Sequence, residues 1–323
     1  MLHDIHIIAP FMLANGGDWR AIDLYLQYSK THHVTLWSPQ LAQEALRAQY
    51  PIQQIKAYSG QSPNTGTLII CGARTEINHW YEHAHFDKVI LIHNLVSPTV
   101  LYKALNRLTL KGKQAIEVMY VSEMVKQIAG LAGKVIYHIP HTERFNPIVK
   151  KYHIQSENFT VGRISTDILA KHHHSAPKVY RALADLGMQI RVIGGTCLAP
   201  WVNQTKYQHH NINLLPMIPQ ADVAQAYNTF DCFYYRTPST VREAYGQVVI
   251  EAMLSGLPVV CHRNGGYAEV IQHGVNGFLF DTYDEAITLI HLLKNNANLR
   301  EKIGMCAQKI TTNNQCESFA QTS

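Results

Sequence analysis

Two glutamates flank a short apolar segment in the string Glu243-Ala-Tyr-Gly-Gln-Val-Val-Ile-Glu251. The pattern predicts a helix over Gln247 to Leu254 whose amino end follows the turn at Tyr245-Gly246. Free backbone N–H groups and the positive end of the helix dipole suit a diphosphate or a sugar at that end. Glu243 precedes this helix and Glu251 lies on it, and a carboxylate that accepts two hydroxyl hydrogen bonds can clamp a vicinal diol. The alternative is that both are ordinary exposed cap and helix residues.

The string continues into AMLSGLPVV and then Gly265-Gly266 with Glu269. On these residues the chain resembles the retaining GT-B glycosyltransferases of family 4, the glycosyl transferases group 1 type. The resemblance implies that Glu251 holds the ribose hydroxyls of a nucleotide-sugar donor. It also implies that Glu243 and the backbone of the next four residues hold the donor sugar. Those four residues are Ala244, Tyr245, Gly246 and Gln247.

A second motif, Val161-Gly162-Arg163-Ile164-Ser165, is an apolar strand followed by a turn. The family has a similar Gly-Arg turn with a lysine shortly afterwards, so the resemblance implies that Gly162 contacts the donor and that both cations neutralise its diphosphate. Negative charge develops on this leaving group as the glycosidic bond breaks, so fixed cations stabilise the transition state more than the ground state. The commonest spacing of the lysine lands on Ile168, and the first lysine in this chain is Lys171. We expect a slightly longer loop to bring Lys171 to the same place; the alternative is a surface lysine beside a weakened site.

Three further positions lie where predicted strands end. Ala14-Asn15-Gly16-Gly17 follows the first strand and opens a helix, either as a glycine-rich donor or acceptor loop or as an ordinary turn. His93 ends the run KVILIH, where it either touches the donor sugar or acceptor or is structural. Gly194-Gly195 closes IRVIGG, either to let the nucleotide approach the backbone or as a tight turn. The family has a loop and a histidine at similar places, and we predict Arg163, Lys171, Glu243 and His93 as the catalytic residues.

Short apolar runs alternate with amphipathic stretches along the chain, beginning with IHIIA, WRAIDLYLQYS and HVTLW. This alternation predicts repeated β-α units on parallel sheets. A polar stretch interrupts it near Lys150 to Glu157, and it begins again at FTVGRIS. We therefore predict an α/β protein of two Rossmann-like, doubly wound parallel-sheet domains that face a cleft, as in GT-B proteins. The acceptor domain is predicted at residues 1–152 and the donor domain at 153–323.

Composition restricts the class of protein. The 323 residues are 46% hydrophobic and only 16% charged, which excludes a disordered chain and suits two domains. The formal charge of +5 comes without a long basic run, so we expect no nucleic acid partner. The 6 cysteines lack a C-x-x-C pair and lie mostly in apolar runs, which favours buried free thiols.

We expect no metal and no cofactor besides the donor, a UDP- or GDP-sugar. No D-x-D motif is present, and the run His172 to His174 lacks the partner spacing of a zinc site. Donor activation is therefore expected to depend on arginine, lysine and helix amides.

The expected location is the cytoplasm. Asp4 and His6 interrupt the apolar start, which predicts a first strand rather than a signal peptide, and no run has the roughly 18 apolar residues of a membrane span. The stretch LYKALNRLTLKGK sets four cations beside leucines, as either a solvated helix face or a peripheral contact with the inner, anionic membrane face. These cations are Lys103, Arg107, Lys111 and Lys113.

The main hypothesis is transfer of a sugar, with retention, from a nucleoside-diphosphate sugar to a hydroxyl of a glycan, glycolipid or protein. One alternative is a non-catalytic glycosyltransferase-like subunit that binds glycan or a partner enzyme, suggested by Ile168 in place of the lysine. Another is a sugar-nucleotide epimerase, which needs no acceptor. The presence of Glu243, Glu251 and Arg163 favours the transferase.

Overall fold

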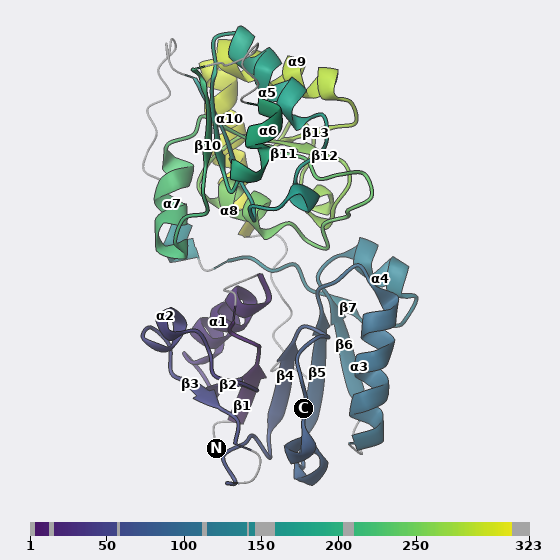
Figure 1. Ribbon diagram of the computed structural model, residues 1–323. Helices are drawn as coiled ribbons and strands as arrows, with labels where there is room; N and C mark the ends of the chain where they lie inside the picture. Colours follow the sequence, from purple (N-terminus) through teal and green to yellow (C-terminus); the bar gives the residue numbers. More distant parts are fainter. Residues whose placement is uncertain are drawn as a thin grey trace. The chain divides into compact units, whose positions relative to one another are not determined.

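The computed structural model describes residues 4–12, 16–56, 59–111, 115–140, 142–145, 159–202 and 210–311 (Figure 1). The chain divides into two compact units, Met1–His141 and Thr142–Ser323, termed unit 1 and unit 2. The predicted boundary near Lys150 to Glu157 lies outside the described residues. Each unit is an α/β body on a parallel sheet, so the predicted fold class of two Rossmann-like domains is confirmed.

The described part of unit 1 contains a seven-stranded sheet in the order β3-β2-β1-β4-β5-β6-β7. Its strands are β1 (Asp4–Ile8), β2 (His33–Ser38), β3 (Ile52–Gln54), β4 (Thr67–Cys71), β5 (Lys88–His93), β6 (Ile116–Tyr120) and β7 (Lys134–Val135). Its helices are α1 (Gly16–Tyr28), α2 (Glu44–Arg47), α3 (Pro98–Lys111) and α4 (Glu123–Ala129), with a 3-10 turn η1 (His79–His83). The central strands β4 and β5 are almost continuously buried and rich in Ile, Leu and Val, as expected where helices cover both faces of a parallel sheet.

Helix α1 buries three charged side chains, Asp18, Arg20 and Asp23. Asp18 Oδ1 accepts a hydrogen bond of 2.8 Å from the backbone N–H of Phe11, in the loop after β1. Asp23 Oδ2 lies 2.8 Å from Nε2 of His138, and both side chains are only 6% exposed. Arg20 Nη1 donates to the carbonyl of Ile136 at 3.4 Å. Helix α1 therefore binds both the start of unit 1 and the segment that follows β7.

The described part of unit 2 contains a six-stranded sheet in the order β10-β9-β8-β11-β12-β13. Its strands are β8 (Thr160–Ile164), β9 (Gln189–Ile193), β10 (Ile212–Leu215), β11 (Cys232–Tyr235), β12 (Val259–His262) and β13 (Phe278–Phe280). Its helices are α5 (Ala176–Asp185), α6 (Ala199–Val202), α7 (Gln220–Asn228), α8 (Gln247–Leu254), α9 (Tyr283–Asn295) and α10 (Ala297–Gln308). Its 3-10 turns are η2 (Thr142–Phe145), η3 (Leu169–Lys171), η4 (Thr196–Leu198), η5 (Gly266–Glu269) and η6 (Lys309–Thr311).

Strand β11 shows how the sheet of unit 2 presents two different faces. Cys232 and Tyr234 join the hydrophobic core formed with α5 and α9. Phe233 and Tyr235 alternate with them, and their rings stack on each other with centroids 6.1 Å apart. Helix α8 packs against β11 and β12.

The chain order of unit 2 reverses between β8 and β11, which are neighbours in the sheet. The strands that follow β8 extend the sheet in one direction, through β9 and β10, and those from β11 onward extend it in the other. Open α/β sheets bind ligands beyond the carboxyl ends of the strands at such a reversal. In unit 2 this point lies between Arg163 and Tyr235, the residues near the carboxyl ends of β8 and β11.

Candidate functional site

Glu243 joins two of the predicted site segments. Its Oε1 lies 2.6 Å from Nζ of Lys171 and accepts a hydrogen bond of 2.9 Å from the hydroxyl of Tyr235. Its backbone forms a parallel bridge with Gly265, and its carbonyl accepts a 2.9 Å hydrogen bond from the N–H of Gly266. Burial, and after it the Glu243 carboxylate, raises the pKa of Tyr235 well above its ordinary value, so this phenol stays a protonated donor.

Lys171 lies in η3, three residues beyond Ile168, and its side chain is 29% exposed. The turn after β8 therefore brings its ammonium group to the predicted sugar carboxylate, across 72 residues of sequence. Its catalytic role stays a prediction.

Arg163 is 1% exposed and completes this cluster. Its guanidinium lies 4.5 Å from the centroid of the Tyr235 ring, and its Nη2 donates to the carbonyl of Lys171. Its Nε and Nη1 have no hydrogen-bond partner among the described residues. Arg163 thus holds the η3 turn in place while two of its nitrogens keep their hydrogen-bonding capacity.

Glu251 lies on α8 and is 3% exposed. Its Oε2 is 3.2 Å from the hydroxyl of Tyr227, and its Oε1 accepts from Gln247 Nε2 at 3.1 Å. The hydroxyl of Tyr227 is also 2.9 Å from the carbonyl of Val248. The carboxylate that the sequence predicts as a diol clamp is therefore held in one orientation by its neighbours.

The amino end of α8 follows the predicted turn. Gly246 has φ +80°, and a Cβ there would lie 2.3 Å from the Tyr267 ring, so only glycine fits. No side chain caps this end of the helix. Ala244 and Tyr245 connect the bridge at Glu243 to this turn, and the donor contacts of residues 244–247 stay predictions.

Packing explains two other predicted glycines. A Cβ on Gly162 would lie 2.1 Å from the Phe230 ring, and one on Gly194, where φ is +72°, would lie 1.8 Å from the carbonyl oxygen of Ser165. His172 reinforces the second contact, because its Nε2 lies 2.9 Å from the carbonyl of Gly194. Burial lowers the pKa of His172 to about 4, so the ring is neutral and donates this hydrogen bond. The donor roles of Gly162 and Gly194 stay predictions.

Unit 1 holds the remaining candidates. His93 ends β5 and is 1% exposed, with both ring nitrogens lacking a partner among the described residues. Burial lowers its pKa to about 4, so it is neutral at pH 7. Gly16 and Gly17 begin α1, whereas Ala14 and Asn15 lie outside the described residues. The loop before them contains a buried Phe11 with φ 51°, a left-handed conformation that is uncommon for a bulky residue.

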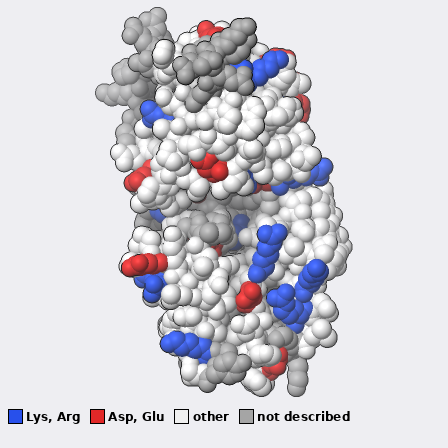
Figure 2. Space-filling model, in the orientation of Figure 1, with Lys and Arg blue, Asp and Glu red and all other residues white. Residues whose placement is uncertain are grey.

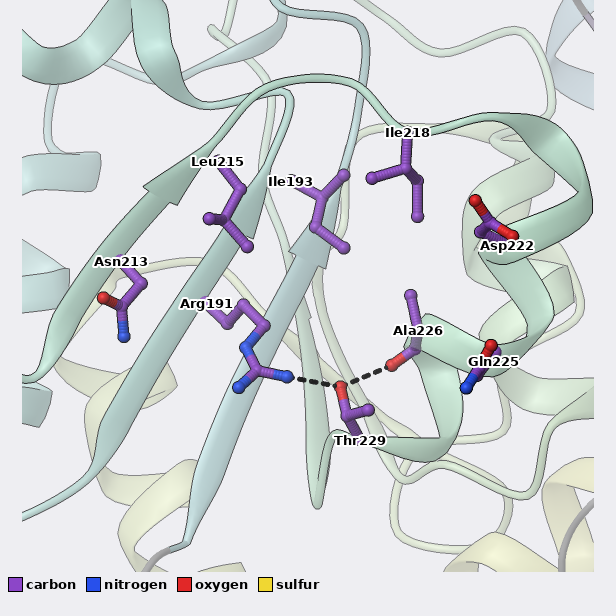
Figure 3. Close-up of a pocket in the computed structure, with 9 residues that line it drawn as sticks. All are labelled: Arg191, Ile193, Asn213, Leu215, Ile218, Asp222, Gln225, Ala226 and Thr229. Atoms are coloured by element: carbon purple, nitrogen blue, oxygen red, sulfur yellow. Dashed lines mark hydrogen bonds between the residues drawn. The ribbon is translucent and has the colours of Figure 1, made fainter.

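A groove of about 490 Å³ lies between β9, β10 and α7, as Figure 3 shows. Arg191 donates to Thr229 at 2.9 Å, and Thr229 donates in turn to the carbonyl of Ala226 at 2.7 Å. The other lining residues are Ile193, Asn213, Leu215, Ile218, Asp222 and Gln225. None of the nine belongs to the predicted donor site, so the groove is separate from the cluster at Glu243.

On the face drawn in Figure 2, cationic side chains gather where Figure 1 draws α3, α4 and β7. On α3, Lys103 and Arg107 are exposed, as are Tyr102 at 46% and Leu110 at 78% exposure. Across the described residues, every helix is too short or too polar to cross a membrane. Those residues also contain no group of three or more His, Cys, Asp or Glu side chains arranged to hold a metal ion.

Sequence reasoning missed Tyr227 and Tyr235, which contact the two predicted carboxylates. Each tyrosine lies in or beside an apolar segment, where an aromatic residue ordinarily indicates core packing. Their contacts with Glu251 and Glu243 span 24 and 8 residues of sequence and follow no helical or strand period. No local pattern could have identified them.

Residues 145–310 match the family model described as "Glycosyl transferases group 1". The chain belongs to this family. The match covers the whole sheet of unit 2 and four of the predicted site residues, Arg163, Lys171, Glu243 and Glu251.

Curated relatives match mainly in shorter stretches. Sulfoquinovosyl transferase SQD2 of Arabidopsis thaliana is 40% identical over 95 residues, which cover 28% of this chain and 18% of the relative. The capsular polysaccharide biosynthesis glycosyltransferase CapM of Staphylococcus aureus is 27% identical over 177 residues, which cover 52% of this chain and 45% of the relative. The chain thus spans less than half the length of either relative.

Solved structures resemble nearly the whole chain. Anabaena Alr3699/HepE, crystallised with UDP and glucose, superposes with a TM-score of 0.71 at 18% identity, over 95% of this chain and 94% of that chain. A glycosyltransferase from Rickettsia africae ESF-5 gives a TM-score of 0.71 at 18% identity, over 97% and 94% of the two chains. At this identity the likeness shows the fold, which is that of GT-B proteins.

Proposed function

We propose that this chain transfers a sugar from a nucleoside-diphosphate sugar to a hydroxyl of a glycan, glycolipid or protein, with retention at the anomeric carbon. The observation that supports it most is the contact of 2.6 Å between Lys171 and Glu243. The contact joins the lysine predicted to bind the diphosphate to the carboxylate predicted to bind the donor sugar, close to the point where the strand order of unit 2 reverses. Family membership supports the same activity.

Arg163 and Lys171 bind the diphosphate in this proposal. Arg163 offers Nε and Nη1, which have no partner among the described residues, and the uncapped amino end of α8 offers backbone N–H groups. Positive groups held before the reaction stabilise the charge that develops on the leaving diphosphate. This chemistry needs no divalent cation.

Glu251 binds the ribose diol, because its two oxygens are already oriented by Tyr227 and Gln247. Glu243 binds hydroxyls of the donor sugar. During transfer the bond from the anomeric carbon to the diphosphate oxygen breaks, and the acceptor oxygen attacks from the same face. The departing diphosphate oxygen takes the proton of the acceptor hydroxyl, so no protein carboxylate has to act as the base.

A uridine nucleotide is the donor that we propose to test first. Alr3699/HepE, whose fold this chain shares, has been crystallised with UDP-glucose and with UDP. The acceptor class comes from the sequence resemblance. Peripheral contact with a membrane through α3 and a cytoplasmic location also remain proposals.

The test measures binding of UDP and GDP by calorimetry, and turnover of a panel of UDP- and GDP-sugars. Lys171→Met should lower kcat/KM by about 100-fold or more, as loss of a transition-state charge partner does. The control is Lys178→Met, which removes an exposed lysine of the same unit that contacts only the hydroxyl and ring of Tyr283 among the described residues. Absence of nucleotide binding, or full turnover by Lys171→Met, would contradict the proposal and favour the non-catalytic subunit.

A further inference from the structure

Arg236 directly follows β11 and is buried without a counterion. It is 9% exposed, and its Nε and Nη1 have no hydrogen-bond partner among the described residues. No carboxylate in that part of the chain forms an ion pair with it. A guanidinium stays charged at any physiological pH, and an unpaired buried charge opposes folding. Such a group is a candidate to bind an anion that is not part of the chain.

Arg236 and His262 both lie close to the ring of Phe280. The guanidinium carbon of Arg236 lies 5.9 Å from the ring centroid, and the ring of His262 lies 5.6 Å from it. Nδ1 of His262 is also buried and has no partner among the described residues. Two side chains with unused nitrogen atoms therefore meet on one aromatic ring at the carboxyl ends of β11, β12 and β13.

His173 adds a third nitrogen donor. It is 5% exposed and interacts electrostatically with Arg236 and His262. Burial, and then the charge of Arg236, lowers the pKa of His173 to about 4, so it is neutral at pH 7. Its Nδ1 accepts the backbone N–H of Ser175 at 3.1 Å, which leaves the ring proton on Nε2. His173 thus offers an N–H group rather than a lone pair.

The surroundings of this cluster favour an anion. Helix α5 begins at Ala176, three residues after His173. Its first turn contains no acidic residue, so the positive end of its dipole is not neutralised there. The carboxylate that acts on His262 is Asp281, and it already lies 3.4 Å from Arg263. The Arg236 charge therefore remains uncompensated by the described part of the chain.

The cluster borders the proposed donor site. Arg236 is the residue after Tyr235, which donates to Glu243, and His173 is two residues after Lys171. The carbonyl of His262 accepts a 2.8 Å hydrogen bond from Tyr267, whose ring touches the Gly246 turn. The chain segments that hold this cluster therefore adjoin those that hold Glu243, Lys171 and the Gly246 turn.

We propose that Arg236, with His173 and His262, binds an oxyanion of the substrate: a carboxylate, sulfonate or phosphate group on the transferred sugar or on the acceptor. That the oxyanion belongs to a sugar-transfer substrate rests on the proposed function. Binding of an anion at Arg236 does not depend on that function. The three side chains fit the class because a guanidinium pairs two N–H groups with two oxygens, and neutral imidazoles add donors without adding charge.

The first experiment uses inorganic sulfate, which requires no nucleotide. Thermal unfolding of the full chain is followed in sulfate and in chloride of equal ionic strength, for the native protein, Arg236→Met and Arg236→Gln. Sulfate also stabilises proteins by exclusion from their surface, so the informative quantity is the difference between variants. The rise in unfolding temperature from chloride to sulfate should be larger for the native protein than for either Arg236 variant, by about 2 °C or more. Arg191→Gln, which removes an arginine of the same sheet outside the cluster, should gain as much as the native protein.

The second experiment compares UDP-glucuronate with UDP-glucose. A preference of about tenfold or more for the anionic donor, lost in Arg236→Met, would assign the oxyanion to the transferred sugar. A sulfate effect that depends on Arg236, without any donor preference, would assign it to the acceptor. If neither depends on Arg236, the proposal is wrong.

Folding of the variants is also informative. Replacing an unpaired buried cation with methionine should leave the unfolding midpoint in chloride unchanged or higher, since such a charge opposes folding. If Arg236→Met and Arg236→Gln both fail to fold, Arg236 is structural and the proposal fails. Loss of UDP binding in the native protein would instead contradict the proposed transferase while leaving the sulfate result intact.

Discussion

At the scale of single residues, each glutamate of the proposed donor site is paired with a buried tyrosine. Tyr235 donates to Glu243 at 2.9 Å, and Tyr227 lies 3.2 Å from Glu251. A tyrosine hydroxyl is a hydrogen-bond donor that does not compete for the positive charges of Arg163 and Lys171. Each carboxylate is thus oriented by an uncharged donor.

Tyr227→Phe should therefore disturb the nucleotide site. Loss of the hydroxyl removes a partner of the buried Glu251 carboxylate, which should lower the unfolding free energy by about 1–2 kcal/mol and the UDP affinity by about 5- to 10-fold. Urea unfolding and calorimetry measure the two effects. Tyr283→Phe is the control, because among the described residues the hydroxyl of Tyr283 contacts only the exposed Lys178. Unchanged UDP affinity in Tyr227→Phe would contradict a ribose clamp at Glu251.

Prediction from sequence succeeded where the residues concerned lie close together along the chain. Glu243, Gly246 and Glu251 form one string, and their order alone predicted a turn followed by a helix. The position of Lys171 was harder to predict, because it depends on the length and path of the loop after β8. The usual spacing in the family placed the lysine at position 168, which is an isoleucine here. Arg236 was not predicted at all, since nothing in FYYRTP indicates that its guanidinium is buried.

At the scale of elements, most strands were predicted from their apolar runs, whereas β3 and β13 were missed. The helix predicted over Gln247 to Leu254 is α8 with the same bounds. Strand β3 (Ile52–Gln54) has one apolar residue, and β13 (Phe278–Phe280) has three residues in all, so neither has a period to detect. The stretch from residue 41 to residue 49 forms only the short helix α2 (Glu44–Arg47).

The close approach of the β8 and β9 ends depends on Gly194. Gly194→Ala should destabilise unit 2 by about 2–4 kcal/mol, since φ is +72° and the new Cβ would lie 1.8 Å from the Ser165 oxygen. Gly274→Ala is the matched control: φ is +78° there too, but nothing lies within 4 Å of the new Cβ, so about 1 kcal/mol is expected. Urea unfolding measures both. If both variants lose the same unfolding free energy, the positive φ angle alone, and not the contact with the Ser165 oxygen, requires glycine at position 194.

At the scale of the whole molecule, buried neutral histidines connect stability to pH in both units. Burial holds the pKa of His93 in unit 1, and of His172 and His173 in unit 2, near 4, against an ordinary value of 6.5. Because the unfolded chain binds these protons more tightly, their contribution is complete above pH 6.5 and is lost as the pH falls from 6.5 through 4.

Acid should therefore destabilise the protein well before its carboxylates titrate. At pH 5 each of the three histidines should lower the unfolding free energy by about 2 kcal/mol relative to pH 7.5. Urea unfolding at the two pH values measures the sum, and His93→Asn should reduce the difference for unit 1. Equal stability at pH 5 and pH 7.5 would contradict the neutral, buried state of these rings.

The contacts of α1 have a consequence for how unit 1 opens. The pair of Asp23 and His138 joins positions 115 residues apart, near the two ends of the unit's chain. Segments that end a compact body ordinarily fray, and their amide hydrogens exchange with solvent independently of the core. Here the segment after β7 can leave only if a buried acid–base pair separates and the Ile136 carbonyl loses Arg20. We therefore expect the amide hydrogens of α1 and of the segment from Ile136 to His138 to exchange in one shared opening event.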